Sequence, residues 1–221
     1  MNIRDTLVTA LHSSDKARPR SRQTQIGPSA LGGCRRQVWH ALQGSPTSNP
    51  DTKRLAAVMG TAIHDAIESA FRTLDPWGER YMLEVEVEHD GLKGHVDLYD
   101  RQERAIVDWK TTKLKSLRYF PDESQWWQVH TYGALMTANG YPVDTVSLVA
   151  IARDGDEGDV VEVTQPFDPA VAEKALEWLK GVEGADAPPA PERPRKVFCG
   201  PYCRFYRADA PIDDPTACPG R

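Results

Sequence analysis

Two short segments decide how this chain folds, Gly94-His95-Val96-Asp97-Leu98 and Ala105-Ile106-Val107-Asp108-Trp109-Lys110. Each is a mostly apolar run with an aspartate set into it, which is typical of a buried strand. A charge in such a run is unfavourable unless another group compensates it. Because side chains alternate along a strand, Asp108 and Lys110 share one face of the second segment. We therefore expect neighbouring strands that present Asp97, Asp108 and Lys110 to a common site.

The residues around these segments predict an α/β fold with a mixed central sheet flanked by helices. Residues 81–89 alternate between apolar and acidic side chains, and the turn Asp90-Gly91 joins them to residues 92–100 as a hairpin. The remaining elements follow from the spacing of apolar residues, with strands over 104–110, 144–152 and 159–165 and helices over 29–41, 51–74, 123–139 and 168–182.

The two aspartates form a candidate metal site. Two carboxylates held close together repel each other, which favours protonation of one of them. A divalent cation removes that penalty, and it can lower the pKa of a water and stabilise charge on a phosphoryl oxygen. Asp97 and Asp108 therefore predict a Mg²⁺ or Mn²⁺ site, beside which Lys110 could orient water or neutralise phosphate. The structural alternative is that each acid pairs with a nearby arginine or lysine at a strand end.

Three residues outside these strands are candidates for the same site. His64 flanks the apolar stripe of helix 51–74, where an imidazole could act as a third metal ligand or pack at the edge of the core. Gln128 and Tyr132 share one face of helix 123–139. They could bind phosphate or a base, or they could pack inside a buried helix. Glu86, on the first strand of the hairpin, is a further candidate near the site.

Taken together, four ordered motifs resemble those of the PD-(D/E)XK nuclease superfamily and, within it, of the RecB-like nucleases: Gly60-Thr61-Ala62-Ile63-His64, Gly94-His95-Val96-Asp97, Asp108-Trp109-Lys110 and Gln128-Val129-His130-Thr131-Tyr132. The resemblance implies a restriction-endonuclease-like core. It implies metal ligation by His64, Asp97 and Asp108, and catalysis by these two acids together with Lys110. Gln128 and Tyr132 would then lie on the side of the substrate.

The cysteines of the chain are one near the start and three near the end, namely Cys34, Cys199, Cys203 and Cys218. Four thiolates suit a 4Fe-4S cluster or a structural zinc ion. An early cysteine followed by a late trio resembles the iron-sulfur CRISPR-associated "Cas four" exonucleases, which implies a structural 4Fe-4S cluster held by all four residues. The last spacing, C-x14-C, is longer than that resemblance leads us to expect. Zinc is one alternative, and four unrelated cysteines are another.

Bulk properties narrow the class of protein. The chain has 221 residues, of which 40% are hydrophobic and 27% charged, so we expect a globular protein. No apolar stretch approaches the length of a membrane span and residues 1–22 lack the apolar core of a signal peptide, so we expect a cytoplasmic location and no membrane partner. The net charge of −5 argues against a protein that coats nucleic acid by bulk charge alone, although local basic clusters can still bind phosphates. The expected parts are a flexible basic lead-in (1–25), a nuclease core whose first helix carries Cys34 (26–198) and a cysteine segment that closes the cluster onto the core (199–221).

The function that these features predict is that of a metal-dependent DNA exonuclease. It would hydrolyse phosphodiester bonds in single-stranded DNA or at DNA ends, since so small a chain has little room for a separate sequence-reading domain. The alternatives are a non-catalytic DNA-binding or assembly module of the same fold, a zinc-stapled nuclease and an enzyme directed at RNA. Self-association, or partner proteins of a recombination or CRISPR-type system, would be compatible with each of these.

Overall fold

The computed structural model describes residues 2–17, 26–49, 52, 55–193 and 195–221. It contains two compact units, which are described separately here. The sheet unit consists of Gly27–Gly32 and Ala62–Leu179. The cysteine unit consists of the described residues up to Ile26 together with Gly33–Thr61 and Lys180–Arg221. Residues 33–61 and 180–198 therefore group with the C-terminal segment, whereas the sequence led us to expect them in the core with the sheet.

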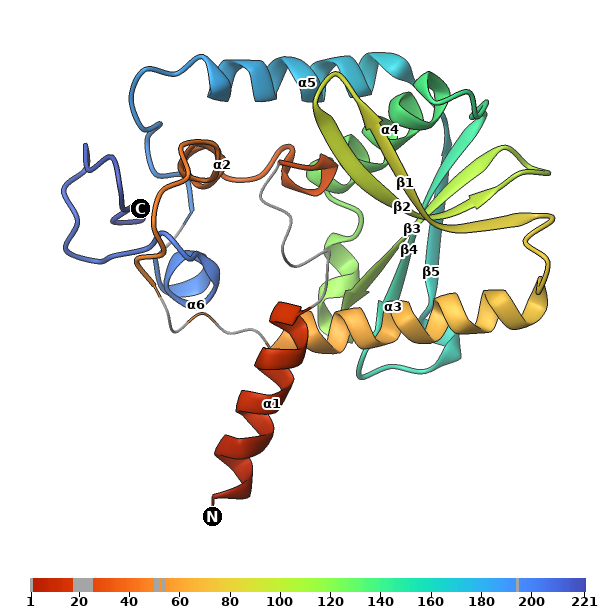
Figure 1. The fold of residues 1–221 in the computed structure, drawn as a ribbon, viewed down its shortest axis with the longest axis horizontal. Helices are drawn as coiled ribbons and strands as arrows, with labels where there is room; N and C mark the ends of the chain where they lie inside the picture. The colour runs from red at the N-terminus through yellow and green to blue at the C-terminus, as the bar shows by residue number, and fades with distance from the viewer. Residues whose placement is uncertain (1, 18–25, 50–51, 53–54, 194) are drawn as a thin grey trace. The chain divides into compact units, whose positions relative to one another are not determined.

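The sheet unit is built on five strands in the order β1-β2-β3-β4-β5 (Figure 1). Neighbouring strands are antiparallel except for β3 and β4, which are parallel, so the expected mixed sheet is confirmed. The strands are β1 (Tyr81–His89), β2 (Leu92–Asp100), β3 (Ala105–Thr112), β4 (Thr145–Ala152) and β5 (Val161–Pro166). The parallel pairing requires a crossover between β3 and β4, which contains η3 (Leu114–Tyr119) and helix α4 (Glu123–Ala138).

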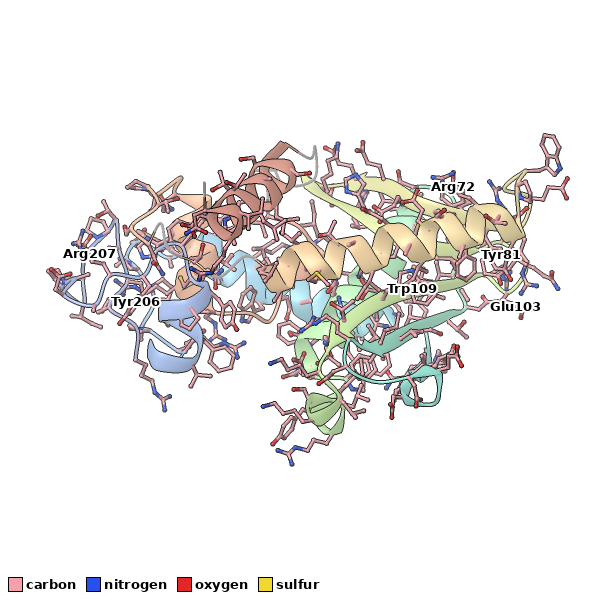
Figure 2. All side chains as sticks on the ribbon, turned by 90° about the horizontal axis from the view of Figure 1, so that it is seen from below. Arg72, Tyr81, Glu103, Trp109, Tyr206 and Arg207 are labelled. Carbon is pink, nitrogen blue, oxygen red and sulfur yellow. The ribbon has the colours of Figure 1, made fainter. Side chains whose placement is uncertain are left out.

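Helices cover both faces of the sheet. The ring of Trp109 in β3 lies 5.7 Å from that of Phe71 in α3 (Leu55–Leu74), and Figure 2 shows Trp109 beside this helix. The adjacent residue Asp108 is hydrogen-bonded to Gln128 of α4. Because successive side chains of a strand point to opposite faces, α3 and α4 lie on opposite sides of β3, which confirms the expected α/β arrangement.

Helix α4 is buried over most of its length. Asp122 caps its N-terminus by accepting a hydrogen bond from the backbone N–H of Gln125, and the Gln125 side-chain oxygen accepts one from the backbone N–H of Asp122. The helix then runs between the sheet and α5 (Pro169–Glu183), where Trp127 contacts Trp178. The core that it covers is apolar and fully inaccessible at Val96, Ile106, Val129, Met136, Val146 and Leu148. This close packing fixes the position of the α4 side chains relative to the strands.

The expected helix over 29–41 is divided in two. Residues Pro28–Ala30 form the short helix η2, and α2 starts at Arg35 and ends at Leu42. Between them Gly32 has a φ of +69°, a conformation that is readily adopted only by glycine. A Cβ atom at Gly32 would also lie only 3.1 Å from Trp127. The helix is therefore interrupted at a glycine, where the backbone passes close to α4.

The cysteine unit contains α1 (Ile3–Ala17), α2, a π-helical turn η5 (Arg195–Cys199) and the short helix α6 (Gly200–Tyr202). Residues 1 and 18–25 of the expected flexible lead-in lie outside the described residues, whereas most of the remainder is the helix α1. Arg36 of α2 is buried and donates hydrogen bonds to four backbone carbonyls, those of Pro189, Ile212, Asp214 and Ala217. This one side chain therefore holds several parts of the C-terminal region together.

Among the described residues, no helix combines the length and the apolar character that crossing a membrane requires.

Candidate metal and phosphate site

The two acids of the central strands occupy opposing positions where β2 and β3 separate. Their pairing runs from Asp100–Ala105 to Leu98–Val107, and the same register makes Asp97 and Asp108 the next opposing residues. Opposing residues of an antiparallel pair point to the same face of the sheet. The Asp97 side chain replaces a ladder bond here, since its Oδ2 accepts a hydrogen bond of 2.9 Å from the backbone N–H of Trp109. Both acids are buried, with exposed fractions of 4% and 2%.

A second group of contacts joins Asp108, Lys110 and Gln128. The Nζ of Lys110 lies 2.6 Å from Oδ2 of Asp108 and donates a hydrogen bond of 2.7 Å to Oε1 of Gln128. The amide nitrogen of Gln128 donates in turn to Oδ1 of Asp108 at 2.9 Å. The three side chains form a closed ring of polar contacts in which each group is oriented by the other two. Such a ring can hold an amine in place for a reaction.

Burial is the main influence on the Asp108 carboxyl group. Desolvation raises the pKa of Asp108, and the nearby negative charge of Asp97 raises it further, while Lys110 and His64 act in the opposite direction. Burial and the charge of Asp97 thus both oppose ionisation of Asp108. A bound divalent cation would favour the ionised form, and a buried pair of carboxylates is the type of ligand that such an ion prefers.

Two further donor side chains, those of His64 and Glu84, converge beside Asp97. His64, Glu84 and Asp97 each offer a nitrogen or oxygen atom, and these atoms all lie within 4.8 Å of one another. The Nδ1 of His64 is 3.6 Å from Oδ2 of Asp97. One imidazole and two carboxylates at this spacing fit a divalent metal ion. Asp108 does not belong to this trio and is instead engaged by Lys110 and Gln128.

Glu84 is the site residue that the sequence interpretation missed. The pairs Leu83–Leu98 and Val85–Val96 place it opposite Asp97, and its φ of +49° lies in the left-handed region. The candidate named from sequence, Glu86, is not one of these three donors. Its carboxylate is exposed and lies 2.8 Å from Nζ of Lys93 on the surface of the hairpin. The turn Asp90-Gly91 contains a usable signal, since counting outward from a two-residue turn brings residue 84 opposite 97.

The two residues expected on the substrate side differ in their surroundings. Gln128 contacts both Asp108 and Lys110, as described above. Tyr132, one turn later, is buried with an exposed fraction of 3%. Its ring packs closely on Gly94, where an added Cβ atom would lie 2.6 Å from Cε1 of Tyr132. The glycine of the Gly94-His95-Val96-Asp97 motif is thus explained by the close approach of this tyrosine, while a role of Tyr132 toward substrate stays a prediction.

The four cysteines all belong to the cysteine unit, and none forms a disulfide. Burial raises the pKa of Cys199 to about 11, and the proximity of Cys203, Cys218 and Cys34 adds to the effect. Cys199 and Cys203 lie one helical turn apart, joined by a backbone hydrogen bond of 2.9 Å. Cys218 is brought to them by its own backbone N–H, which donates to the carbonyl of Phe205 at 2.8 Å. The long C-x14-C spacing therefore still returns Cys218 to the segment that carries Cys199 and Cys203.

Comparison with known proteins gives a consistent result. A family model described as the PD-(D/E)XK nuclease superfamily matches residues 77–208, more than half of the chain. No curated protein matches. The crystal structure of SSO0001 is similar with a TM-score of 0.56 and 19% sequence identity, over 97% of this chain and 98% of that one. An alkaline exonuclease (LHK-Exo) from Laribacter hongkongensis is similar with a TM-score of 0.50 and 12% identity, over 74% of this chain and 88% of that one. With the family match, these likenesses confirm the restriction-endonuclease-like fold.

Proposed function

Because the chain belongs to the PD-(D/E)XK nuclease superfamily, we propose that it is a metal-dependent DNA exonuclease. One observation carries the proposal: the convergent donors of His64, Glu84 and Asp97 adjoin the ring formed by Asp108, Lys110 and Gln128. A trio that can hold a cation thus lies next to an oriented amine. The position of His64 beside Asp97 also favours the RecB-like branch of the superfamily.

Different residues of the site would bind the metal ion, contact the phosphate and hold the catalytic lysine in position. Mg²⁺ or Mn²⁺ would be held by His64, Asp97 and Asp108, with Glu84 as a further oxygen donor. When bound, such an ion supplies a Lewis acid that activates water and stabilises charge on phosphoryl oxygens. Lys110 offers N–H donors that can neutralise a phosphate oxygen or orient the attacking water. Donors that are already in position before the reaction stabilise transition-state charge without the cost of reorganisation. Gln128 keeps both Lys110 and Asp108 in place.

The proposed substrate is single-stranded DNA or a DNA end. The similar structure from Laribacter hongkongensis is named as an alkaline exonuclease, and this supports, for the present chain, removal of nucleotides from an end over cleavage at an internal sequence. None of the four cysteines forms a disulfide, which agrees with the proposed reducing, cytoplasmic setting. Action within a recombination or CRISPR-type assembly, or as a homo-oligomer, is compatible with this reaction.

Cleavage of end-labelled DNA tests the proposal. Asp108→Ala and Lys110→Ala should each lower the rate with Mn²⁺ at least about 100-fold, the size of effect typical of a lost charge-stabilising group. Lys93→Ala is the matched control, because it removes a lysine that pairs with Glu86 away from the trio. Rates like the wild type in both site variants would contradict the mechanism. Strands blocked at one end or the other would give the polarity.

A non-catalytic DNA-binding or assembly module is the rival from another class. It would keep the same fold and would bind DNA, yet it would cleave no form of DNA at any Mg²⁺ or Mn²⁺ concentration. A metal titration against single-stranded and duplex DNA distinguishes the two. The complete set of Asp97, Asp108, Lys110 and Gln128 favours the enzyme, since a purely structural module has no need of an amine held by two polar groups.

We also propose that Cys34, Cys199, Cys203 and Cys218 hold a 4Fe-4S cluster with a structural role, as in the iron-sulfur "Cas four" exonucleases. The mutual influence of the four thiols supports this proposal. In this arrangement residues 199–221 close the cluster onto the helix that follows Cys34. The visible spectrum of protein purified without oxygen is the test. A brown protein with a broad sulfur-to-iron band would support the cluster, and a colourless protein with bound zinc would support the zinc-stapled alternative.

A further inference from the structure

The crossover after β3 carries a cationic surface on an otherwise acidic protein. Residues 113–120, called the η3 segment from here on, contain the exposed side chains Lys113, Lys115 and Arg118. No acidic residue occurs between Asp108 and Asp122, although the whole chain has a net charge of −5. Figure 2 shows this segment, in green, projecting from the sheet unit with its side chains directed away from the strands. A concentrated positive charge of this kind attracts a polyanion.

The η3 segment also exposes aromatic surface. Tyr119 is 68% exposed, and the guanidinium group of Arg118 lies over its ring, 4.7 Å from the centroid. Residues three apart are eclipsed in a 3₁₀ helix, so Lys115 and Arg118 form one row beside the tyrosine. An exposed aromatic ring flanked by cations is the combination that proteins use to stack bases while they track a phosphate backbone.

The segment is held at the end of the strand that carries the site. Leu114 donates its backbone N–H to Oδ1 of Asp154 at 2.8 Å, and Arg153 donates to the backbone carbonyl of Thr111 at 3.2 Å. The last residues of β3 are paired with β4 as far as Thr112–Ala152. Lys113 therefore lies at most about 11 Å of extended chain from Lys110, which is within reach of a strand bound at the metal site.

We propose that the η3 segment binds the single-stranded part of the substrate, with Lys113, Lys115 and Arg118 contacting phosphates and Tyr119 stacking on an unpaired base. This inference rests on the proposed DNA nuclease function and names the surface that selects single strands. A base inside a duplex has both faces occupied by its neighbours, so away from a DNA end Tyr119 can stack only where the strand is unpaired. The cations contact the backbone of either form.

Binding measured without divalent cations tests the inference apart from catalysis. The full chain is titrated with a fluorescent oligothymidylate and with an abasic oligomer of the same length and charge, and anisotropy is recorded. Tyr119→Ala should weaken binding of the oligothymidylate about 5- to 10-fold and leave the abasic oligomer unchanged. The double variant Lys113→Ala/Lys115→Ala should weaken both and reduce the slope of log K against log salt by about 1.4.

Two control variants come from the opposite end of β3, near its first residues. Trp77 is 86% exposed and precedes β1, whose first residue pairs with Asp100, while Arg101 is exposed directly after Asp100. Asp100 pairs in turn with Ala105, the first residue of β3. Trp77→Ala and Arg101→Ala should bind both oligomers like the wild type. The inference is overturned if the η3 variants behave like these controls, or if Tyr119→Ala weakens the abasic oligomer equally.

The same experiment separates this inference from the proposed function. A protein that binds oligothymidylate through Tyr119 but cleaves no DNA with Mn²⁺ would contradict the nuclease proposal and support the binding surface. If the protein cleaves DNA normally but its η3 variants bind like the controls, the nuclease proposal is supported and the η3 binding surface is contradicted.

Discussion

Glu84 of β1 lies directly opposite Asp97 of β2, in a backbone conformation that β-strand residues rarely adopt. Its φ of +49° interrupts the regular pairing between Leu83–Leu98 and Val85–Val96. A left-handed residue other than glycine persists only where the surroundings enforce it, and such residues gather at functional sites. Here the left-handed residue is Glu84, and one of its carboxylate oxygens lies within 4.8 Å of donor atoms of His64 and Asp97.

Glu84→Gln should weaken Mn²⁺ binding at least about tenfold, because it removes one negative oxygen ligand from the trio. Glu86→Gln is the matched control, since it makes the same change two residues along the strand, at a carboxylate paired with Lys93. Isothermal titration calorimetry measures both. If the two variants bind Mn²⁺ with equal affinity, Glu84 is not a metal ligand.

Gln128→Met should lower the rate of cleavage about 10- to 100-fold without changing the affinity for DNA. The methionine fills a similar volume but leaves Lys110 and Asp108 without the group that orients them, and misplacement of a catalytic group has effects of this size. Gln102→Met on the exposed turn after β2 serves as the control. Single-turnover kinetics at saturating DNA would show the loss, and an unchanged rate would mean that the ring of contacts has no catalytic role.

Arg36→Met should destabilise the protein by at least about 3 kcal/mol, because four backbone carbonyls, in one buried and three partly buried hydrogen bonds, lose their donor at once. Arg35→Met should cost less than about 1 kcal/mol, since Arg35 forms an exposed pair with Glu192. Urea unfolding gives the two values, and limited proteolysis should cut between residues 189 and 217 in the first variant only. Similar stabilities of the two variants would contradict the anchoring role of Arg36.

The metal-free and cluster-free protein should lose stability as the pH rises from about 9 to about 11. Burial and the neighbouring thiols raise the pKa of Cys199 from 9.0 to about 11. In that range the unfolded chain releases a proton that the folded chain retains, so the free energy of unfolding falls with pH. Below that range both states hold the proton and this contribution is constant. When urea unfolding is followed from about pH 9 to about pH 11, Cys199→Ala should lose less stability than the wild type. Identical pH profiles of the two proteins would contradict the raised pKa of Cys199.

Gly94→Ala should destabilise the sheet unit by about 1–3 kcal/mol, because its Cβ atom would lie 2.6 Å from Tyr132 and 2.9 Å from Pro28. Gly181→Ala is a suitable control, since an added Cβ atom there meets nothing within 4 Å and alanine favours the helix. Thermal unfolding should show a lower Tm for the first variant and an unchanged or higher Tm for the second. A normal Tm for Gly94→Ala would mean that α4 can move away at little cost.

The sequence by itself determined the strands and helices of the sheet unit to within a few residues. The hairpin 81–89 and 92–100 was predicted with its observed bounds, because alternation and a two-residue turn are local signals. The same alternation put Asp108 and Lys110 on one face of β3. The motif order in turn pointed to the family that the comparison confirms.

Only the tertiary structure decided which polar groups meet. Arg35 and Arg36 are indistinguishable as neighbours in the sequence, yet one is exposed and the other buried. The carbonyls that bind Arg36 lie 153 to 181 residues further along the chain. Likewise, three glutamates share one face of β1, and the register against β2 selects Glu84. Local patterns fix the face of an element, whereas the partner of a side chain depends on contacts between distant segments that form only when the chain packs.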